Sequence, residues 1–176
     1  MKFIVLLRGV NVGGKNRVDM KLLKEAFIIY GFSDVKTYIN SGNIIFESQI
    51  TDIDVIKEKC QGLILEKFGL KIFVAVLTWD SVSEALKNAP DWWGEDPESK
   101  HNAIFVIPPA TTQGILAEVG ESKPDYEKVD FYGNVIFWSA PVKTFSKTRW
   151  SKIVGTSAYN KITIRNFNTT KKLIEI

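Results

Sequence analysis

The chain has 176 residues, of which 45% are hydrophobic and 24% charged, and this balance excludes an intrinsically disordered protein. Its single cysteine, Cys60, excludes an intramolecular disulfide and a zinc site made of cysteines alone. The net charge of +3 is unevenly spread, because residues 141–176 are strongly basic and residues 79–140 are acidic. The basic segment either attracts the acidic middle of the same chain or meets phosphate groups.

The N-terminal half reads as alternating strands and helices. The apolar run Phe3–Leu7 predicts a buried strand, and it is too short for a signal peptide or a membrane span. A turn-rich stretch follows, and Asp19 then caps a helix whose apolar residues recur at helical spacing up to Gly31. With the single cysteine, these features indicate a cytoplasmic protein that does not enter a membrane.

The next elements complete a recognisable order. Val35–Asn40 and Asn43–Glu47 predict a hairpin around a Ser-Gly turn, and a helix capped by Thr51 runs to Gly69. Lys71–Leu77 predicts a fourth strand that is too hydrophobic to face water, so something should cover it. The order βαββαβ is the ferredoxin-like pattern, in which the first and third strands are central.

The second half repeats this order faintly. Residues 132–137 resemble residues 41–46, and both read as the turn and third strand of one unit. Further elements are expected as strands at 103–107 and 129–131 and as helices near 112–119 and 147–154. We therefore predict an α+β fold of two ferredoxin-like modules with antiparallel sheets, an internal duplication with domains at 1–79 and 80–176.

A glycine-rich loop, Gly9–Asn16, follows the first strand. It approaches the phosphate-loop pattern G-x-x-x-x-G-K-[ST] but ends in Asn16, which is a poor magnesium ligand. The helix is also expected to begin near Asp19 rather than at Lys15, and a hairpin follows where a parallel sheet would continue. These departures argue against ATP or GTP hydrolysis.

The loop still has the chemistry of an anion site. Flexible amides at Gly13 and Gly14 and the cations of Arg8, Lys15 and Arg17 come just before a helix N-terminus, which suits a phosphate or carboxylate. In the alternative interpretation the glycines only let the loop turn, the cations are solvated, and the asparagines bond local backbone.

A second basic stretch lies at the C-terminus. Arg165, Asn166 and Lys171 could hold an acidic group; alternatively Arg165 pairs with a carboxylate and Phe167 belongs to the core. Asn168 or Thr169 is expected to cap a final helix.

Residues for catalysis and metal binding are sparse. The single histidine, His101, excludes metal sites with paired histidines, and it is expected at the surface or in a turn. Cys60 falls on an apolar helical stripe, which indicates core packing.

Residues 43–46 lack the basic start and stacking rings of an RNA-recognition strand. We expect no catalytic residue, no metal and no cofactor.

Three segments together resemble one bacterial family, domain of unknown function 1697. They are Leu6–Asn16, Thr37–Phe46 and Thr163–Thr169, so the resemblance spans almost the whole chain. The chain departs from the family pattern at Phe167, where tryptophan is expected, and at Asp19, where proline is frequent. The resemblance implies a two-part α+β fold and a bacterial cytosolic protein, and it implies no activity.

Three functions remain open. The first is a noncatalytic module that binds an anion or phosphate of a nucleotide or nucleic acid; the second is an enzyme acting on a small anionic or phosphorylated substrate, with Lys15 and Arg165 as clamps. In the third, the motifs only fasten the two modules together. The candidate ligand-binding residues are Arg8, Asn11, Gly13, Gly14, Lys15, Asn16, Ser41, Asn43, Arg165, Asn166 and Lys171.

Overall fold

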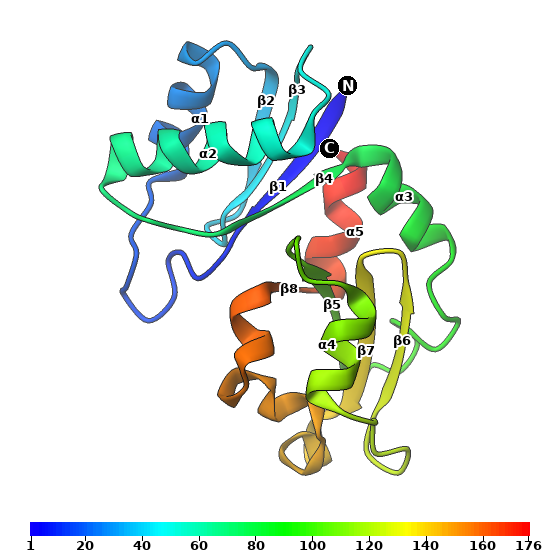
Figure 1. Ribbon diagram of the computed structural model, residues 1–176. Helices are drawn as coiled ribbons and strands as arrows, with labels where there is room; N and C mark the ends of the chain where they lie inside the picture. The colour runs from blue at the N-terminus through cyan, green and yellow to red at the C-terminus, as the bar shows by residue number, and fades with distance from the viewer. The chain divides into compact units, whose positions relative to one another are not determined.

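The computed structural model describes residues 1–176, and they form two compact units. The first unit comprises residues 1–82 with 173–176, and the second comprises residues 83–172. Each unit contains one four-stranded antiparallel sheet together with helices, so the predicted α+β class is confirmed (Figure 1). None of the helices is both long and apolar enough to cross a membrane.

The first unit has its strands in the order β2-β3-β1-β4. Its elements are β1 (Lys2–Leu7), α1 (Met20–Ile29), β2 (Ser33–Tyr38), β3 (Asn43–Glu47), α2 (Ile53–Phe68) and β4 (Val74–Thr78). The most apolar strands, β1 and β3, are central as predicted, and Val5 of β1 lies opposite Ile44 on one side and Val76 on the other. Helices α1 and α2 lie on one face of this sheet (Figure 1), where Leu23 and Ile56 are fully buried in its core.

The ends of these helices follow from their capping residues. Asp19 caps α1 as predicted, whereas α2 is capped by Asp52 and not by Thr51. The carboxylate of Asp52 accepts hydrogen bonds from the backbone amides of Asp54 and Val55 at 2.9 and 3.1 Å. Gly69 ends α2 in the left-handed conformation that glycine adopts at low cost, with φ of 67°. The sequence therefore predicted correctly that a polar side chain caps α2, but it placed this N-cap one residue too early.

The second unit has its strands in the order β6-β7-β5-β8. Its elements are β5 (Ser99–Val106), α4 (Thr112–Val119), β6 (Lys128–Tyr132), β7 (Val135–Pro141), β8 (Ile162–Asn166) and α5 (Phe167–Glu175), and α3 (Trp79–Lys87) precedes them. The predicted helix at 112–119 is confirmed. The end of α5 is grouped with the first unit, and the start of α3 likewise belongs there.

The α-helix expected near 147–154 is wrong. Residues 142–161 instead form three short 3₁₀ helices, η1 (Val142–Lys147), η2 (Trp150–Gly155) and η3 (Ser157–Lys161). The backbone amides of Arg149 and Trp150 donate to the carboxylate of Glu127 at 2.8 and 3.1 Å. The amides of Thr148, Lys152 and Thr156 donate to carbonyls three residues back, those of Phe145, Arg149 and Ile153, which is the 3₁₀ pattern of hydrogen bonds.

Candidate functional site

The loop between β1 and α1 is a small hairpin. The Lys15 amide donates to the Val12 carbonyl and the Asn11 amide to the Asn16 carbonyl, both at 3.1 Å. Gly13 and Gly14 occupy the two central positions of the turn, with φ of 58° and 76°. Two successive positive φ angles define a type I′ turn, in which glycine avoids the strain that a side chain would cause.

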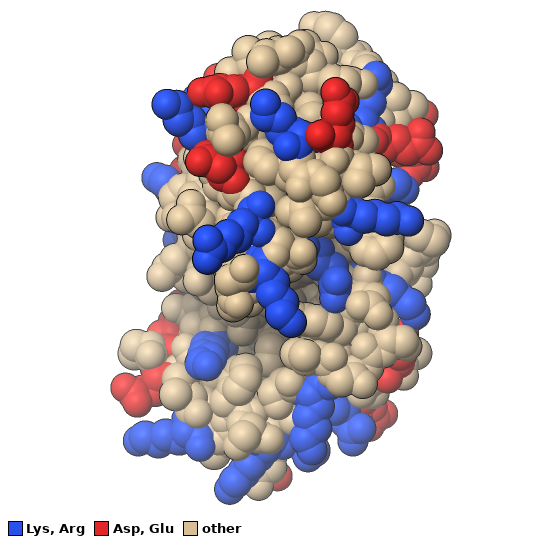
Figure 2. Space-filling model, turned by 90° about the vertical axis from the view of Figure 1, so that its left-hand side faces the viewer, with Lys and Arg blue, Asp and Glu red and all other residues tan.

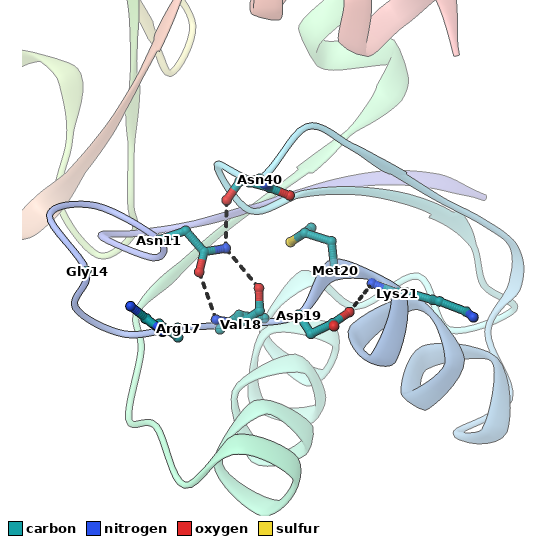
Figure 3. Close-up of a pocket in the computed structure, with 8 residues that line it drawn as sticks. All are labelled: Asn11, Gly14, Arg17, Val18, Asp19, Met20, Lys21 and Asn40. Atoms are coloured by element: carbon teal, nitrogen blue, oxygen red, sulfur yellow. Dashed lines mark hydrogen bonds between the residues drawn. The ribbon is translucent and has the colours of Figure 1, made fainter.

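Asn11 fixes this hairpin to the rest of the first unit. Its Nδ2 donates to the carbonyls of Val18 and Asn40 at 2.9 and 2.8 Å, and its Oδ1 accepts from the Val18 amide at 2.9 Å (Figure 3). Asn16 Nδ2 likewise donates to the Gly9 carbonyl at 3.0 Å. Asn16 thus bonds only local backbone, as the structural interpretation of the loop expects, whereas Asn11 bonds both local backbone and the distant Asn40 carbonyl. If a ligand binds at this loop, Asn11 would act by positioning the loop.

An open hollow of about 620 Å³ lies between this loop and the start of α1. Eight residues line it, and Figure 3 shows them: Asn11, Gly14, Arg17, Val18, Asp19, Met20, Lys21 and Asn40. Pockets of several hundred cubic ångströms are the size that small-molecule ligands occupy. The hollow therefore has room for a ligand considerably larger than a single phosphate ion.

The helix N-terminus at this hollow already holds an anion of the protein itself. The carboxylate of Asp19 accepts hydrogen bonds from the amides of Lys21 and Leu22 at 2.8 and 3.1 Å. These are amides that would otherwise favour an external phosphate. The first turn of α1 is therefore partly neutralised, and anion binding would depend on the loop and its cations.

The cations near the hollow do not converge. Figure 3 shows the side chains of Arg17 and Lys21 on opposite sides, directed away from each other. Both are exposed, as is Lys15, so their side chains can reorient at little cost beyond rotamer entropy. Figure 2 shows basic side chains gathered over the part of the first unit where the loop lies, with acidic and basic side chains mixed above them.

The amides of Gly13 and Gly14 are available at the tip of the loop. Both glycines are exposed, and the structure gives their N–H groups no hydrogen bond within the protein. Backbone N–H groups are strong donors, and two of them in sequence at a turn can face one anion.

Three other candidate residues lie elsewhere in the first unit: Arg8, Ser41 and Asn43. The Arg8 amide donates to the Phe73 carbonyl at 3.0 Å, next to β4, and its side chain is half-buried. Asn43 is fully buried, and its Nδ2 donates to the Tyr38 carbonyl and the Ser41 hydroxyl, both at 2.9 Å. Ser41 and Asn43 thus close the turn between β2 and β3.

The three C-terminal candidates lie in the second unit. Arg165 is buried, which lowers its pKa to about 10, and its Nη1 donates to the Thr163 hydroxyl and the Ile164 carbonyl at 2.8 and 2.9 Å. Asn166 caps α5 by accepting from the Thr169 amide at 2.8 Å, so the expected cap at Asn168 or Thr169 is wrong. Lys171 lies over the Phe167 ring, 5.2 Å from its centre.

The histidine and the cysteine both have structural environments. His101 lies within β5 and not in a turn, and it is partly exposed; its Nδ1 accepts from the Gly94 amide at 3.0 Å and lies 2.6 Å from the Ser139 hydroxyl. Cys60 is fully buried in α2, and burial raises its pKa to about 12, so the predicted core packing is confirmed. The structure shows no group of three acidic, histidine or cysteine side chains that could hold a metal ion.

Sequence reasoning missed Asn40 in the hollow. It lies in the β2–β3 turn, 29 residues beyond its hydrogen-bonding partner Asn11. No local pattern joins two such distant positions, so only the folded sheet brings Asn40 to the hollow.

Comparisons with known proteins identify the family of the chain. A search of curated proteins finds no match. Among solved structures, the chain is similar to the conserved bacterial protein SP0830 from Streptococcus pneumoniae, with 30% identity and a TM-score of 0.88, over 99% of this chain and 97% of that one. Residues 1–137 match the family model described as "Protein of unknown function (DUF1697)". The chain therefore belongs to this family of proteins, as the resemblance of its N-terminal loop and hairpin predicted.

Proposed function

We propose that the first unit is a noncatalytic anion-binding module whose Gly9–Asn16 loop holds a phosphate group of a nucleotide or nucleic acid. The observation that carries this proposal is the pair of exposed amides at Gly13 and Gly14, whose N–H groups donate to no acceptor within the protein. The exposed cations of Lys15 and Arg17 lie beside them in the chain. Amides and cations around a cavity form the usual donor set for phosphate oxygens.

Electrostatics set the expected strength of this binding. Solvent-exposed charge pairs contribute only about 0–1 kcal/mol each, and Asp19 at the edge of the hollow repels an incoming anion. A single phosphate group should therefore bind weakly. A nucleic acid would gain affinity from several phosphates at once, and its binding would fall steeply as salt is added.

A thermal-shift screen with nucleotides, phosphosugars and short oligonucleotides tests the proposal, with wild type, Lys15→Ala and Lys87→Ala compared. A ligand that binds the folded state at about 100 times its Kd stabilises it by about 2.7 kcal/mol, which raises the Tm. We expect a rise for wild type and for Lys87→Ala, whose exposed lysine ends α3 and is not part of the Gly9–Asn16 loop, and a smaller rise for Lys15→Ala, whose lysine lies in that loop. If no phosphate compound changes the Tm at low salt, the loop has only the structural role that its internal hydrogen bonds support.

We infer also that both units are ferredoxin-like modules that arose by duplication, with the boundary near residue 80. Support comes from the strand orders β2-β3-β1-β4 and β6-β7-β5-β8, which match when each unit's strands are numbered from its own first strand. The three 3₁₀ helices would then replace the second helix of the pattern. Superposing β1, β2, β3 and β4 on β5, β6, β7 and β8 in that order tests this inference, and a better fit in another order would contradict it.

A further inference from the structure

The 3₁₀ helices of the second unit carry unpaired cations. Residues 142–161 contain five basic side chains and no acidic one. Of these five, only Lys161 forms a salt bridge, at 2.8 Å to Glu118. The other four are exposed and have no carboxylate partner: Lys143, Lys147, Arg149 and Lys152. The acidic middle of the chain therefore does not neutralise them by direct pairing.

The loop 120–127 adds a further cation and is joined to the 3₁₀ helices. Lys123 Nζ donates to the Lys147 carbonyl at 3.1 Å, and Lys147 Nζ lies 5.7 Å from the centre of the Tyr126 ring. Glu127 accepts from the backbone amides of Lys123 and Arg149 at 3.0 and 2.8 Å, which holds the two segments together. We call these five cations the basic surface: Lys123, Lys143, Lys147, Arg149 and Lys152.

A second hollow, of about 420 Å³, adjoins the basic surface. Apolar side chains that are not fully buried line it, those of Leu116, Pro124 and Val129. Gly120 lines it too, and a Cβ built there would lie 3.3 Å from Arg149 Nη1, so the guanidinium lies against this part of the wall. Apolar surface thus lies directly beside a cation.

Acidic side chains offset only part of this charge. Glu121, which also lines the second hollow, and Asp125 are exposed on the loop 120–127. Glu127 is buried, and both of its oxygens accept hydrogen bonds within the protein. Figure 2 faces the side on which the 3₁₀ helices lie in Figure 1, and it shows basic side chains spread over its lower part with acidic ones mostly at the edges.

These features fit a single strand of nucleic acid. Cations spread over two segments can each contact a different phosphate of one backbone. Proteins that bind single strands combine such cations with apolar or aromatic surfaces on which the bases lie. The partly exposed Tyr126 ring beside Lys147 and the second hollow beside Arg149 provide these surfaces. In a duplex the bases are stacked inside and reach neither of them.

We propose that the second unit has its own site for single-stranded nucleic acid, in which the basic surface contacts phosphates and a base lies in the second hollow. This site is separate from the Gly9–Asn16 loop and does not depend on the function proposed for the first unit. It also gives the basic C-terminal segment a partner outside the chain.

Two variants with the same loss of charge test the site. The first combines three substitutions on the basic surface: Lys143→Gln, Lys147→Gln and Lys152→Gln. The control combines three at exposed lysines outside both proposed sites: Lys67→Gln, Lys71→Gln and Lys87→Gln. Glutamine keeps a long polar side chain, so neither variant should lose its fold.

Fluorescence anisotropy of a labelled oligothymidylate of about twelve nucleotides, titrated with the full chain at several salt concentrations, measures the binding. At about 0.1 M salt we expect the Kd to rise at least about tenfold in the first variant and less than about twofold in the control. The slope of log Kd against log salt concentration should fall by about 2 in the first variant, since each phosphate contact on a single strand contributes about 0.7.

An abasic strand of the same length tests the role of the bases. It has the phosphates without the bases, so wild type should bind it at least about tenfold more weakly than oligothymidylate. Equal Kd values for the two strands would show that the surface attracts any polyanion, and the nucleic acid assignment would be wrong.

The variants also separate this inference from the proposed function. Equal Kd values for oligothymidylate in the first variant and the control would show that the basic surface is not the site. If Lys15→Ala loses binding and the first variant keeps it, the strand binds at the Gly9–Asn16 loop. The inference then fails, and the proposed function stands.

Discussion

Replacing Glu127 with Gln should destabilise the second unit by about 3 kcal/mol, because two of four converging N–H groups lose an acceptor. Glu127 is buried, with 3% of its surface exposed. Its Oε1 accepts from the Lys123 and Arg149 amides at 3.0 and 2.8 Å, and its Oε2 accepts from the Trp150 amide and the Trp138 indole, both at 3.1 Å.

The change from carboxylate to amide isolates this effect. Glutamine has nearly the same volume, but its NH₂ group would face two N–H donors instead of accepting from them. Amide hydrogen exchange at Arg149 and Trp150 measures the result locally, and we expect protection at both to fall in Glu127→Gln. Glu121→Gln, at an exposed position, is the control and should leave it unchanged. Equal protection in both variants would show that the carboxylate does not hold this segment.

Replacing Gly42 with Ala should destabilise the first unit by about 2–5 kcal/mol, the sum of a strained backbone and a steric clash. Gly42 has φ of 76°, and a Cβ built on it would lie 2.6 Å from both Leu7 Cβ and Val10 Cγ2. Neither neighbour can move freely, since both are buried beneath the β2–β3 turn.

Gly13→Ala separates the two contributions to this loss. Gly13 also has a positive φ, 58°, but a Cβ there meets no atom within 4 Å. It should therefore cost only about 1–2 kcal/mol from the backbone conformation. Urea unfolding followed by far-UV circular dichroism compares the two variants. A loss in Gly13→Ala as large as that in Gly42→Ala would contradict the steric explanation.

Local sequence patterns predicted most of the elements. The stripe of apolar residues and its cap placed α1, and the run Thr112–Val119 was expected as the helix that the structure shows. The glycines of the first loop likewise predicted a tight turn, which Gly13 and Gly14 form. These features depend on neighbours in the chain, which is why the sequence reveals them.

Contacts between distant residues account for the rest. Glu127 binds amides 22 and 23 residues further along, in the segment that was expected as an α-helix and forms 3₁₀ turns. The sequence does not encode rotamers at exposed positions, so it could not show that the side chains of Arg17 and Lys21 at the hollow point apart. Asp19 could be identified as a cap, although not as a group that shares the hollow with those cations.

The most direct test of anion binding observes the two glycine amides themselves. In ¹⁵N-labelled protein at low ionic strength, titration with inorganic phosphate should shift the Gly13 and Gly14 amide signals along a saturating curve, with the same concentrations of chloride as the control. We expect the Lys15→Ala variant to require more phosphate for the same shift. If these two signals do not move with phosphate, or move equally with chloride, the loop does not bind phosphate.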